Sequence, residues 1–179
     1  MGAVTGYSKL LAHLPVFAGL SNVEAGDLAQ FMHLEQKQPG ADLCKEGEPG
    51  DAMFVLEKGT VVALKRTDQG DDQVLATIVG PSVVGELALI DGAPRSATVR
   101  AKTVITVYRI AVKDFDRLRE KHHTGAHKVL KNLALMLCER LRDTNDRISE
   151  FFSDPQKSLA AIQRRQKELW QKRQQGAAE

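Results

Sequence analysis

Residues 84–101 read VGELALIDGAPRSATVRA, and this stretch holds more local structural signals than any other part of the chain. Gly85 precedes a short apolar run, residues 86–90, that is typical of a brief helix. An Asp-Gly turn and a proline follow, and Arg95 then opens a run that is typical of a strand. The free N–H groups of a helix start, together with a planar guanidinium, can bind an anion.

Glu86 fits such a site only if its carboxylate faces a hydroxyl group, because it would repel the anion. A phosphate with a hydroxyl beside it is the chemistry of a nucleotide. Taken alone, an arginine at a strand start or a glutamate at a helix start is an ordinary surface feature. The two residues together, in this register, predict a ligand site.

The segment lies in a part of the chain that glycine and proline interrupt at short intervals, with eight of the 14 glycines between residues 40 and 92. Between the interruptions, β-branched runs predict short strands joined by tight turns. These runs cover residues 53–56, 60–66, 73–79, 96–101 and 104–110. The middle of the chain is therefore predicted to be an all-β sandwich or roll.

Helical patterns flank this β region. From residue 9 to 34 apolar residues recur at helical spacing, and Ser21 precedes Glu24 as in a capping box. Residues 113–120 predict a brief helix, and a long helix follows over residues 126–152.

The long helix has a heptad pattern of apolar residues. One set of positions is Leu130, Leu137, Thr144 and Phe151, and the other is Leu133 or Ala134, Leu141 and Ile148. A helix of about 40 Å is longer than a β-domain of this size needs for its own covering. We therefore expect a homodimer through residues 126–152.

These patterns divide the chain into an N-terminal helical segment at 1–38, a β-roll at 39–111, a hinge and long helix at 112–153, and a tail at 154–179. From residue 155 onward there are six basic and two acidic residues. This amphipathic tail either packs on a partner or forms a basic surface for nucleic acid or a membrane.

Composition limits the class of protein. The chain of 179 residues is 42% hydrophobic and 27% charged, which fits one domain of ordinary size plus an extension. We find neither a membrane-spanning stretch nor a secretory leader, so a cytoplasmic location is expected. The formal charge of +2 does not by itself imply nucleic acid as a partner. Cys44 and Cys138 are expected to be buried thiols, because no CxxC pairing is present.

Residues 84–101 resemble the phosphate-binding cassette of cyclic nucleotide-binding domains, the family of the bacterial catabolite activator proteins and the protein kinase A regulatory domains. The resemblance extends to residues 46–51, the strand at 54–56 and the turn at 58–60, and it covers roughly residues 10–152. It implies an α+β, mainly β fold: an antiparallel β-roll or jelly roll of about eight short strands, with N-terminal helices and a long C-terminal helix.

The resemblance also implies roles for individual residues. Glu86 would accept a hydrogen bond from the ribose 2′-hydroxyl, and Arg95 would pair with the cyclic phosphate. The backbone N–H groups of Leu87, Ala88 and Ala97 and the Ser96 hydroxyl would complete the phosphate site, and Gly85 would allow close approach of the chain. Apolar contacts to the sugar or base would come from Val74, Leu75 and Val84. Val84 stands where many members of the family have phenylalanine.

On the long helix, Thr144 and Asn145 stand where the catabolite activators use small polar residues to bind adenine from both subunits. A polar residue that fixes the register of a coiled coil also explains Thr144. Arg140, one turn earlier on the same face, is a further candidate ligand-binding residue.

The resemblance implies a receptor for cAMP, with cGMP as the alternative because Ser96 is compatible with either. Binding would be transmitted through the C-terminal helix to an effector protein or a second subunit. The chain is too short for the helix-turn-helix of the activators, so we expect a free-standing receptor; a fragment of a channel or kinase regulator is another possibility. The alternative function is a dimeric scaffold with a degenerate pocket that acts through its basic tail on nucleic acid or a membrane.

No enzymatic activity, metal or cofactor is expected, apart from cAMP or cGMP as ligand. The sequence has no P-loop, no recognisable nucleophilic triad and no pair of carboxylates in a plausible site. His122, His123 and His127 lack further ligands at a spacing that would support a metal site.

Overall fold

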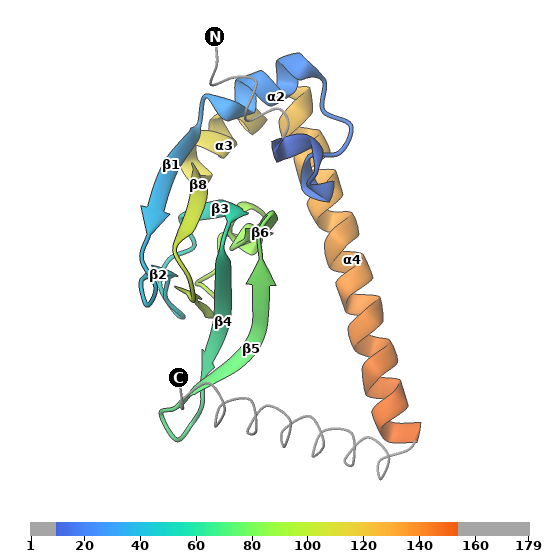
Figure 1. Ribbon diagram of the computed structural model, residues 1–179. Helices are drawn as coiled ribbons and strands as arrows, with labels where there is room; N and C mark the ends of the chain where they lie inside the picture. The colour runs from blue at the N-terminus through green and yellow to red at the C-terminus, as the bar shows by residue number, and fades with distance from the viewer. Residues whose placement is uncertain (1–9, 154–179) are drawn as a thin grey trace. The chain divides into compact units, whose positions relative to one another are not determined.

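The computed structural model describes residues 10–153, which fall into two compact units that divide after Ala134. The first unit contains all the strands, and the second contains most of the last helix (Figure 1). The elements are η1 (Pro15–Phe17), α2 (Asn22–Ala29), β1 (Met32–Lys37), β2 (Asp42–Cys44), β3 (Ala52–Lys58), β4 (Thr60–Arg66), β5 (Asp72–Val79), β6 (Ser82–Val84), η2 (Glu86–Leu89), β7 (Thr98–Ala101), β8 (Ile105–Ala111), α3 (Val112–Glu120) and α4 (Thr124–Ser153).

Two four-stranded antiparallel sheets form the roll, in the orders β1-β8-β3-β6 and β2-β7-β4-β5. Strand β3 is buried at five consecutive residues, 52–56, because it lies inside its sheet and η2 packs against it. The core between the sheets consists of Cys44, Ala52, Phe54, Leu56, Val61, Val84, Val99, Ala101, Ile105 and Val107. The predicted mainly β roll of about eight short strands is confirmed.

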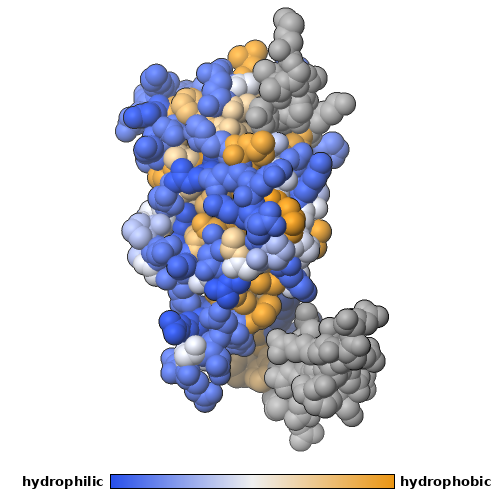
Figure 2. All heavy atoms as spheres, turned by 60° about the vertical axis from the view of Figure 1, so that its left-hand side comes forward, coloured by the Kyte–Doolittle hydropathy of each residue, from blue (hydrophilic) through white to orange (hydrophobic). Residues whose placement is uncertain are grey.

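The roll begins earlier than predicted. Residues 32–37, placed in the N-terminal helical segment, form β1, which pairs with β8. The helical interpretation of these residues was wrong because β1 is an edge strand with only Met32 buried, so it lacks the alternation that marks a strand. The face that carries β1 is mostly hydrophilic, with scattered hydrophobic residues (Figure 2). The division of the chain at residues 112 and 154 stays a prediction.

The N-terminal helices are fixed to the start of α4. The predicted capping box is confirmed: the Ser21 hydroxyl accepts from the Glu24 N–H at 3.3 Å, and the Glu24 carboxylate accepts from the Ser21 N–H at 2.7 Å. The same carboxylate accepts from Lys128 Nζ at 2.7 Å. Hydrogen bonds from Lys128 and Ser21 lower the pKa of Glu24 to about 2. The side-chain amide of Asn132 donates to two carbonyls at residues 16 and 18.

The predicted helices are confirmed as α3 and α4. Within the first unit α4 buries Ala126, Val129 and Leu133. The tail at 154–179 lies outside the described residues. None of the helices within residues 10–153 is long and apolar enough to cross a membrane. Cys44 is buried as expected, but Cys138 is exposed, so the expectation of a buried thiol was wrong there. Cys138 lies on α4 beyond Leu133, the last buried residue of that helix.

Gly59 joins β3 to β4 at a point where another segment leaves no room for a side chain. Its φ is +94°, and a Cβ would lie 2.5 Å from the Val104 carbonyl oxygen. Gly70 has nearly the same φ, +90°, but a Cβ there would have no neighbour within 4 Å. The two positions therefore separate backbone strain from steric exclusion.

We predict that Gly70→Ala lowers the free energy of unfolding by about 1–2 kcal/mol, because a Cβ is disfavoured at positive φ. Gly59→Ala should cost a further ~1–3 kcal/mol, because the strands must also shift. Urea denaturation of both variants measures the difference. Equal losses would mean that the β3–β4 turn accommodates a side chain.

Candidate functional site

The turn between β6 and η2 is shaped by Gly85. This residue has φ +70°, in the left-handed region, and it forms the N-cap of η2. A Cβ at Gly85 would lie 2.7 Å from Nη1 of Arg95. Any other residue would therefore be strained in its backbone and would displace the arginine.

Arg95 is a buried cation, with 7% of its surface exposed. Its Nη1 donates to the Gly85 carbonyl at 3.3 Å, and its Nη2 donates to Asp51 Oδ1 at 3.0 Å. The guanidinium lies over the Phe54 ring, 5.7 Å from its centroid. Its buried Nε has no hydrogen-bond partner among residues 10–153. The site thus holds a desolvated positive charge whose Nε donor is unused. Leaving a buried donor without a hydrogen-bond partner costs free energy, which a bound ligand would recover.

The backbone of Arg95 is tied to the segment before β3. Its N–H donates to the Glu48 carbonyl at 2.8 Å, and its carbonyl accepts from the Gly47 N–H at 2.9 Å. The next residue is also fixed, because Lys65 Nζ donates to the Ser96 carbonyl at 3.1 Å and pairs with Glu46 at 2.6 Å. The motif at residues 46–51, which the resemblance included, therefore positions the cassette.

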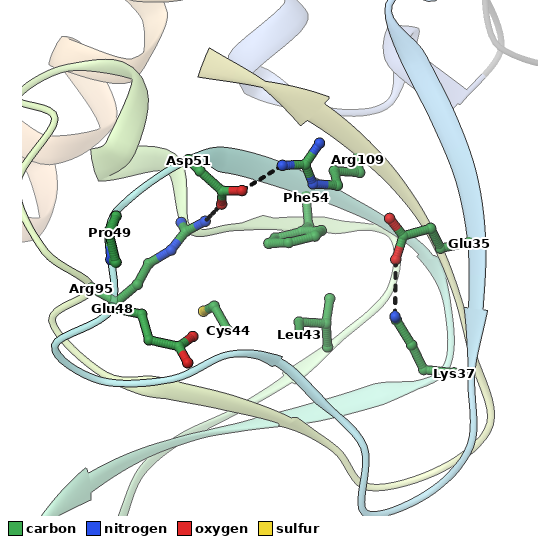
Figure 3. A pocket seen from close by; sticks show the side chains of 10 residues that line it. All are labelled: Glu35, Lys37, Leu43, Cys44, Glu48, Pro49, Asp51, Phe54, Arg95 and Arg109. Carbon is green, nitrogen blue, oxygen red and sulfur yellow. Dashed lines mark hydrogen bonds and ion pairs between the residues drawn. The ribbon is translucent and has the colours of Figure 1, made fainter. Parts of the chain in front are cut away.

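Asp51 lies between two arginines, as Figure 3 shows. Its Oδ1 accepts from Arg95, and its Oδ2 accepts from Nη2 of Arg109 at 2.5 Å. Partial burial opposes ionisation of the carboxyl, but hydrogen bonds from Arg109 and Arg95 outweigh it and lower the pKa of Asp51. The carboxylate is therefore charged at neutral pH.

A pocket of about 520 Å³ lies beside these three residues (Figure 3). It opens where β1 and β2, edge strands of the two sheets, contribute side chains to its lining. Its lining consists of Glu35, Lys37, Leu43, Cys44, Glu48, Pro49, Asp51, Phe54, Arg95 and Arg109. Burial raises the pKa of the Cys44 thiol, so this group is neutral. Arg95 is the one predicted ligand-binding residue that lines this pocket.

The other cassette residues differ in exposure. Glu86 and Ala88 are buried in η2, Leu87 and Ala97 are half-buried, and Ser96 is exposed. Val84 is buried in the roll core. The structure thus brings Gly85 and Arg95 into contact and places Glu86 next to Gly85 at the start of η2.

Val74 and Leu75 lie on β5, an edge strand, and are 46% and 55% exposed. The register of β5 shifts between them, because Ala63 pairs with Ala76 and Leu64 pairs with Val74. Leu75 therefore lies in a β-bulge without a partner of its own in β4. Their contact with a sugar or base stays a prediction.

Arg140, Thr144 and Asn145 are exposed residues of α4 in the second unit. The Thr144 hydroxyl donates to the Arg140 carbonyl at 2.8 Å, one helical turn earlier. A threonine makes this bond in many helices, and its oxygen can still accept a hydrogen bond. The roles of all three residues stay predictions.

The sequence analysis assigned no role to Asp51, Phe54 or Arg109. Asp51 stood within the motif at residues 46–51, so a signal for it was present. Arg109 stands 58 positions from Asp51 in a run that looked like an ordinary strand, and no local pattern pointed to it.

The histidines considered as metal ligands have other contacts. The rings of His122 and His127 are stacked, and Nε2 of His123 lies 3.1 Å from a carboxylate oxygen of Asp27. Within the described range, no group of three or more His, Cys, Asp or Glu side chains could hold a metal ion.

Two curated relatives share about a third of their aligned residues with this chain. Glutaminase 1 of Bradyrhizobium diazoefficiens is 34% identical over 138 residues, which are 77% of this chain and 22% of that protein. The cAMP-dependent protein kinase regulatory subunit of Yarrowia lipolytica is 34% identical over 112 residues, 63% of this chain and 29% of that protein. The chain therefore spans less than a third of the length of either relative.

A solved structure has the same fold. The crystal structure of a cyclic nucleotide-binding domain from Methylobacillus flagellatus matches with a TM-score of 0.71 and 27% identity, over 83% of this chain and 85% of that one. The family model described as the cyclic nucleotide-binding domain matches residues 34–122, which include Asp51, the whole cassette and Arg109. The chain belongs to the cyclic nucleotide-binding domain family.

Proposed function

We propose that this chain is a receptor module for a cyclic nucleotide, and that its ligand is cAMP. The observation that carries the proposal is the state of Arg95: a buried guanidinium, held by Gly85 and Asp51, whose Nε has no partner in the described part of the chain. A planar guanidinium binds two phosphate oxygens at once. The charge and the unused donor both suit a cyclic phosphate.

The remaining contacts would be arranged around this pair of charges. Glu86 follows Gly85 directly and is buried, so its carboxylate would bind the ribose hydroxyl beside the phosphate. The N–H groups of Leu87, Ala88 and Ala97 and the hydroxyl of Ser96 would complete the phosphate site. Val74 and Leu75 would lose exposed apolar surface to the sugar or base, which favours binding.

The choice of cAMP over cGMP rests on the relatives. The Yarrowia lipolytica relative is named for its dependence on cAMP, and the chain aligns with it over 112 residues. The activity named for the Bradyrhizobium diazoefficiens relative is not carried over, because this chain covers only 22% of that protein. We expect no enzymatic activity from the chain itself.

We further propose that binding is transmitted through α4 to a second subunit or an effector protein. Leu141 and Ile148 belong to the predicted heptad seam and are 61% and 50% exposed, and Phe151 continues the seam. An apolar row of this kind on a helix favours pairing with another helix. We therefore propose a homodimer through this helix.

The first test is calorimetric titration of the purified chain with cAMP and, separately, with cGMP. We expect cAMP to bind at micromolar or lower concentration and more tightly than cGMP. Tighter binding of cGMP would support the proposed receptor function but would make cGMP, not cAMP, its ligand. A folded chain that binds neither would refute the proposed function.

Replacement of Arg95 tests whether its guanidinium binds the cyclic phosphate. Arg95→Ala should lose about 2–5 kcal/mol of cAMP binding free energy, because the phosphate would be left without its charged partner. Arg95→Lys keeps the charge but not the fork, and its affinity should lie between those of Arg95→Ala and the wild type. Arg117→Ala, which breaks only a surface ion pair on α3, is the matched control. Affinity of Arg95→Ala within about threefold of wild type would show that Arg95 does not bind the phosphate, provided that thermal melting shows a folded variant.

The seam is tested by a charge placed on one face of α4. Leu141→Asp should convert the dimer to a monomer in sedimentation velocity, because a buried unpaired carboxylate is costly. Leu135 is similarly exposed, at 53%, but lies off the heptad seam, so Leu135→Asp should leave the dimer intact. Wild-type protein that sediments as a monomer at every concentration would disprove the homodimer.

A further inference from the structure

The phosphate site has an outer part that neither the cassette nor the comparisons assign to ligand binding. We propose that Arg109 is a positioning residue for cyclic nucleotide binding: it neutralises Asp51, so that the charge of Arg95 remains available to the phosphate. This inference rests on the proposed function, because it takes Arg95 as the phosphate ligand.

The first step of the argument is a count of charges. Asp51, Arg95 and Arg109 form a continuous cluster of one carboxylate and two guanidinium groups, with a formal sum of +1. A cyclic phosphate diester carries one negative charge, so the occupied cluster would be neutral. Without Arg109, the same occupied cluster would have a sum of −1, and the carboxylate and the phosphate would compete for one arginine.

The second step is the geometry of the carboxylate. Asp51 uses Oδ1 for Arg95 and Oδ2 for Arg109, so the two contacts do not exclude each other. The side chain of Arg95 is 4% exposed, whereas that of Asp51 is 63% exposed. Water can therefore solvate Asp51 but not Arg95. The electrostatic energy of the buried guanidinium is therefore set by neighbouring protein groups. Arg109 offsets the negative charge that Asp51 presents to Arg95.

The third step is the position of Arg109 in the sheet. It lies on β8, where it pairs with Phe54 of β3 on one side and with His33 of β1 on the other. Phe54 is the residue whose ring lies beneath the Arg95 guanidinium. Two strand pairings thus fix the backbone of Arg109 at a constant place relative to Arg95, as a residue that orients a binding group requires.

The other charged groups of the pocket make contacts of their own. Glu35 and Lys37 form an ion pair of their own at 3.1 Å. The Glu48 carboxylate accepts from the Lys45 N–H at 3.1 Å. Neither contact involves Asp51, whose carboxylate both arginines contact in Figure 3.

The test is a double-mutant cycle read by cAMP titration. Arg109→Gln should weaken cAMP binding about tenfold, because the Asp51 carboxylate, no longer neutralised, would compete with the phosphate for Arg95. The same replacement in an Asp51→Asn background should change affinity by less than about twofold, since the carboxylate that Arg109 neutralises is gone. Arg109→Lys keeps the charge and should restore affinity to within about threefold of wild type. Arg117→Gln, on α3, is the charge-matched control and should bind as the wild type does.

The outcomes separate this inference from the proposed function. If the wild type binds cAMP and Arg95→Ala does not, but Arg109→Gln binds like the wild type, the inference is wrong and the function stands. An equal loss in both Asp51 backgrounds would make Arg109 a purely structural residue and would also overturn the inference. If the wild type binds neither nucleotide, the function and the inference fail together. Thermal melting checks folding, and Arg109→Met replaces the glutamine variant if that one does not fold.

Discussion

A cation buried inside a β-roll is the constraint on which the rest of this structure depends. The Arg95 side chain is 4% exposed, so its charge must be stabilised by protein groups. The requirement explains why a carbonyl, a carboxylate and an aromatic face converge there from Gly85, Asp51 and Phe54. It also explains the glycine at position 85, since a Cβ would lie only 2.7 Å from Nη1 of the guanidinium. Residues far apart in the sequence thus stabilise the charge of one buried arginine.

Most of the roll could be predicted because its strands are separated by local signals. Glycines bound β4 and β5, and the predicted limits of those strands lie within one residue of the observed ones. Strand β1 could not be predicted in this way, because five of its six side chains are exposed or half-buried and only its pairing with β8 makes it a strand. Strands β2 and β6 have three residues each, too few for any period to appear. Tertiary pairing, which one sequence does not display, decided these elements.

The candidate site divides in the same way. The cassette is contiguous, so Gly85, Glu86 and Arg95 could be recognised together from their spacing. The Asp51 contacts span 44 residues to Arg95 and 58 residues to Arg109, and strand pairing alone brings these groups together. Arg109 looked like any charged residue on a strand. The sequence therefore predicts the cassette but not Asp51 and Arg109, the charged residues that the fold places beside it.

Asp51 also connects the arginine cluster to the helices. Its carbonyl accepts from the N–H of Val112, the first residue of α3, at 2.9 Å. The end of α3 leads through residues 121–123 into α4, whose first turns are held by Glu24 and Val16. Under the proposed function, Asp51 would connect the phosphate to α3, because it contacts Arg95 with its side chain and Val112 with its backbone carbonyl. Such a path transmits binding only if the nucleotide favours one arrangement of α3 and α4 over another. The charge balance at Asp51 is where that preference would arise, because a phosphate on Arg95 changes the field that holds this carboxylate in place.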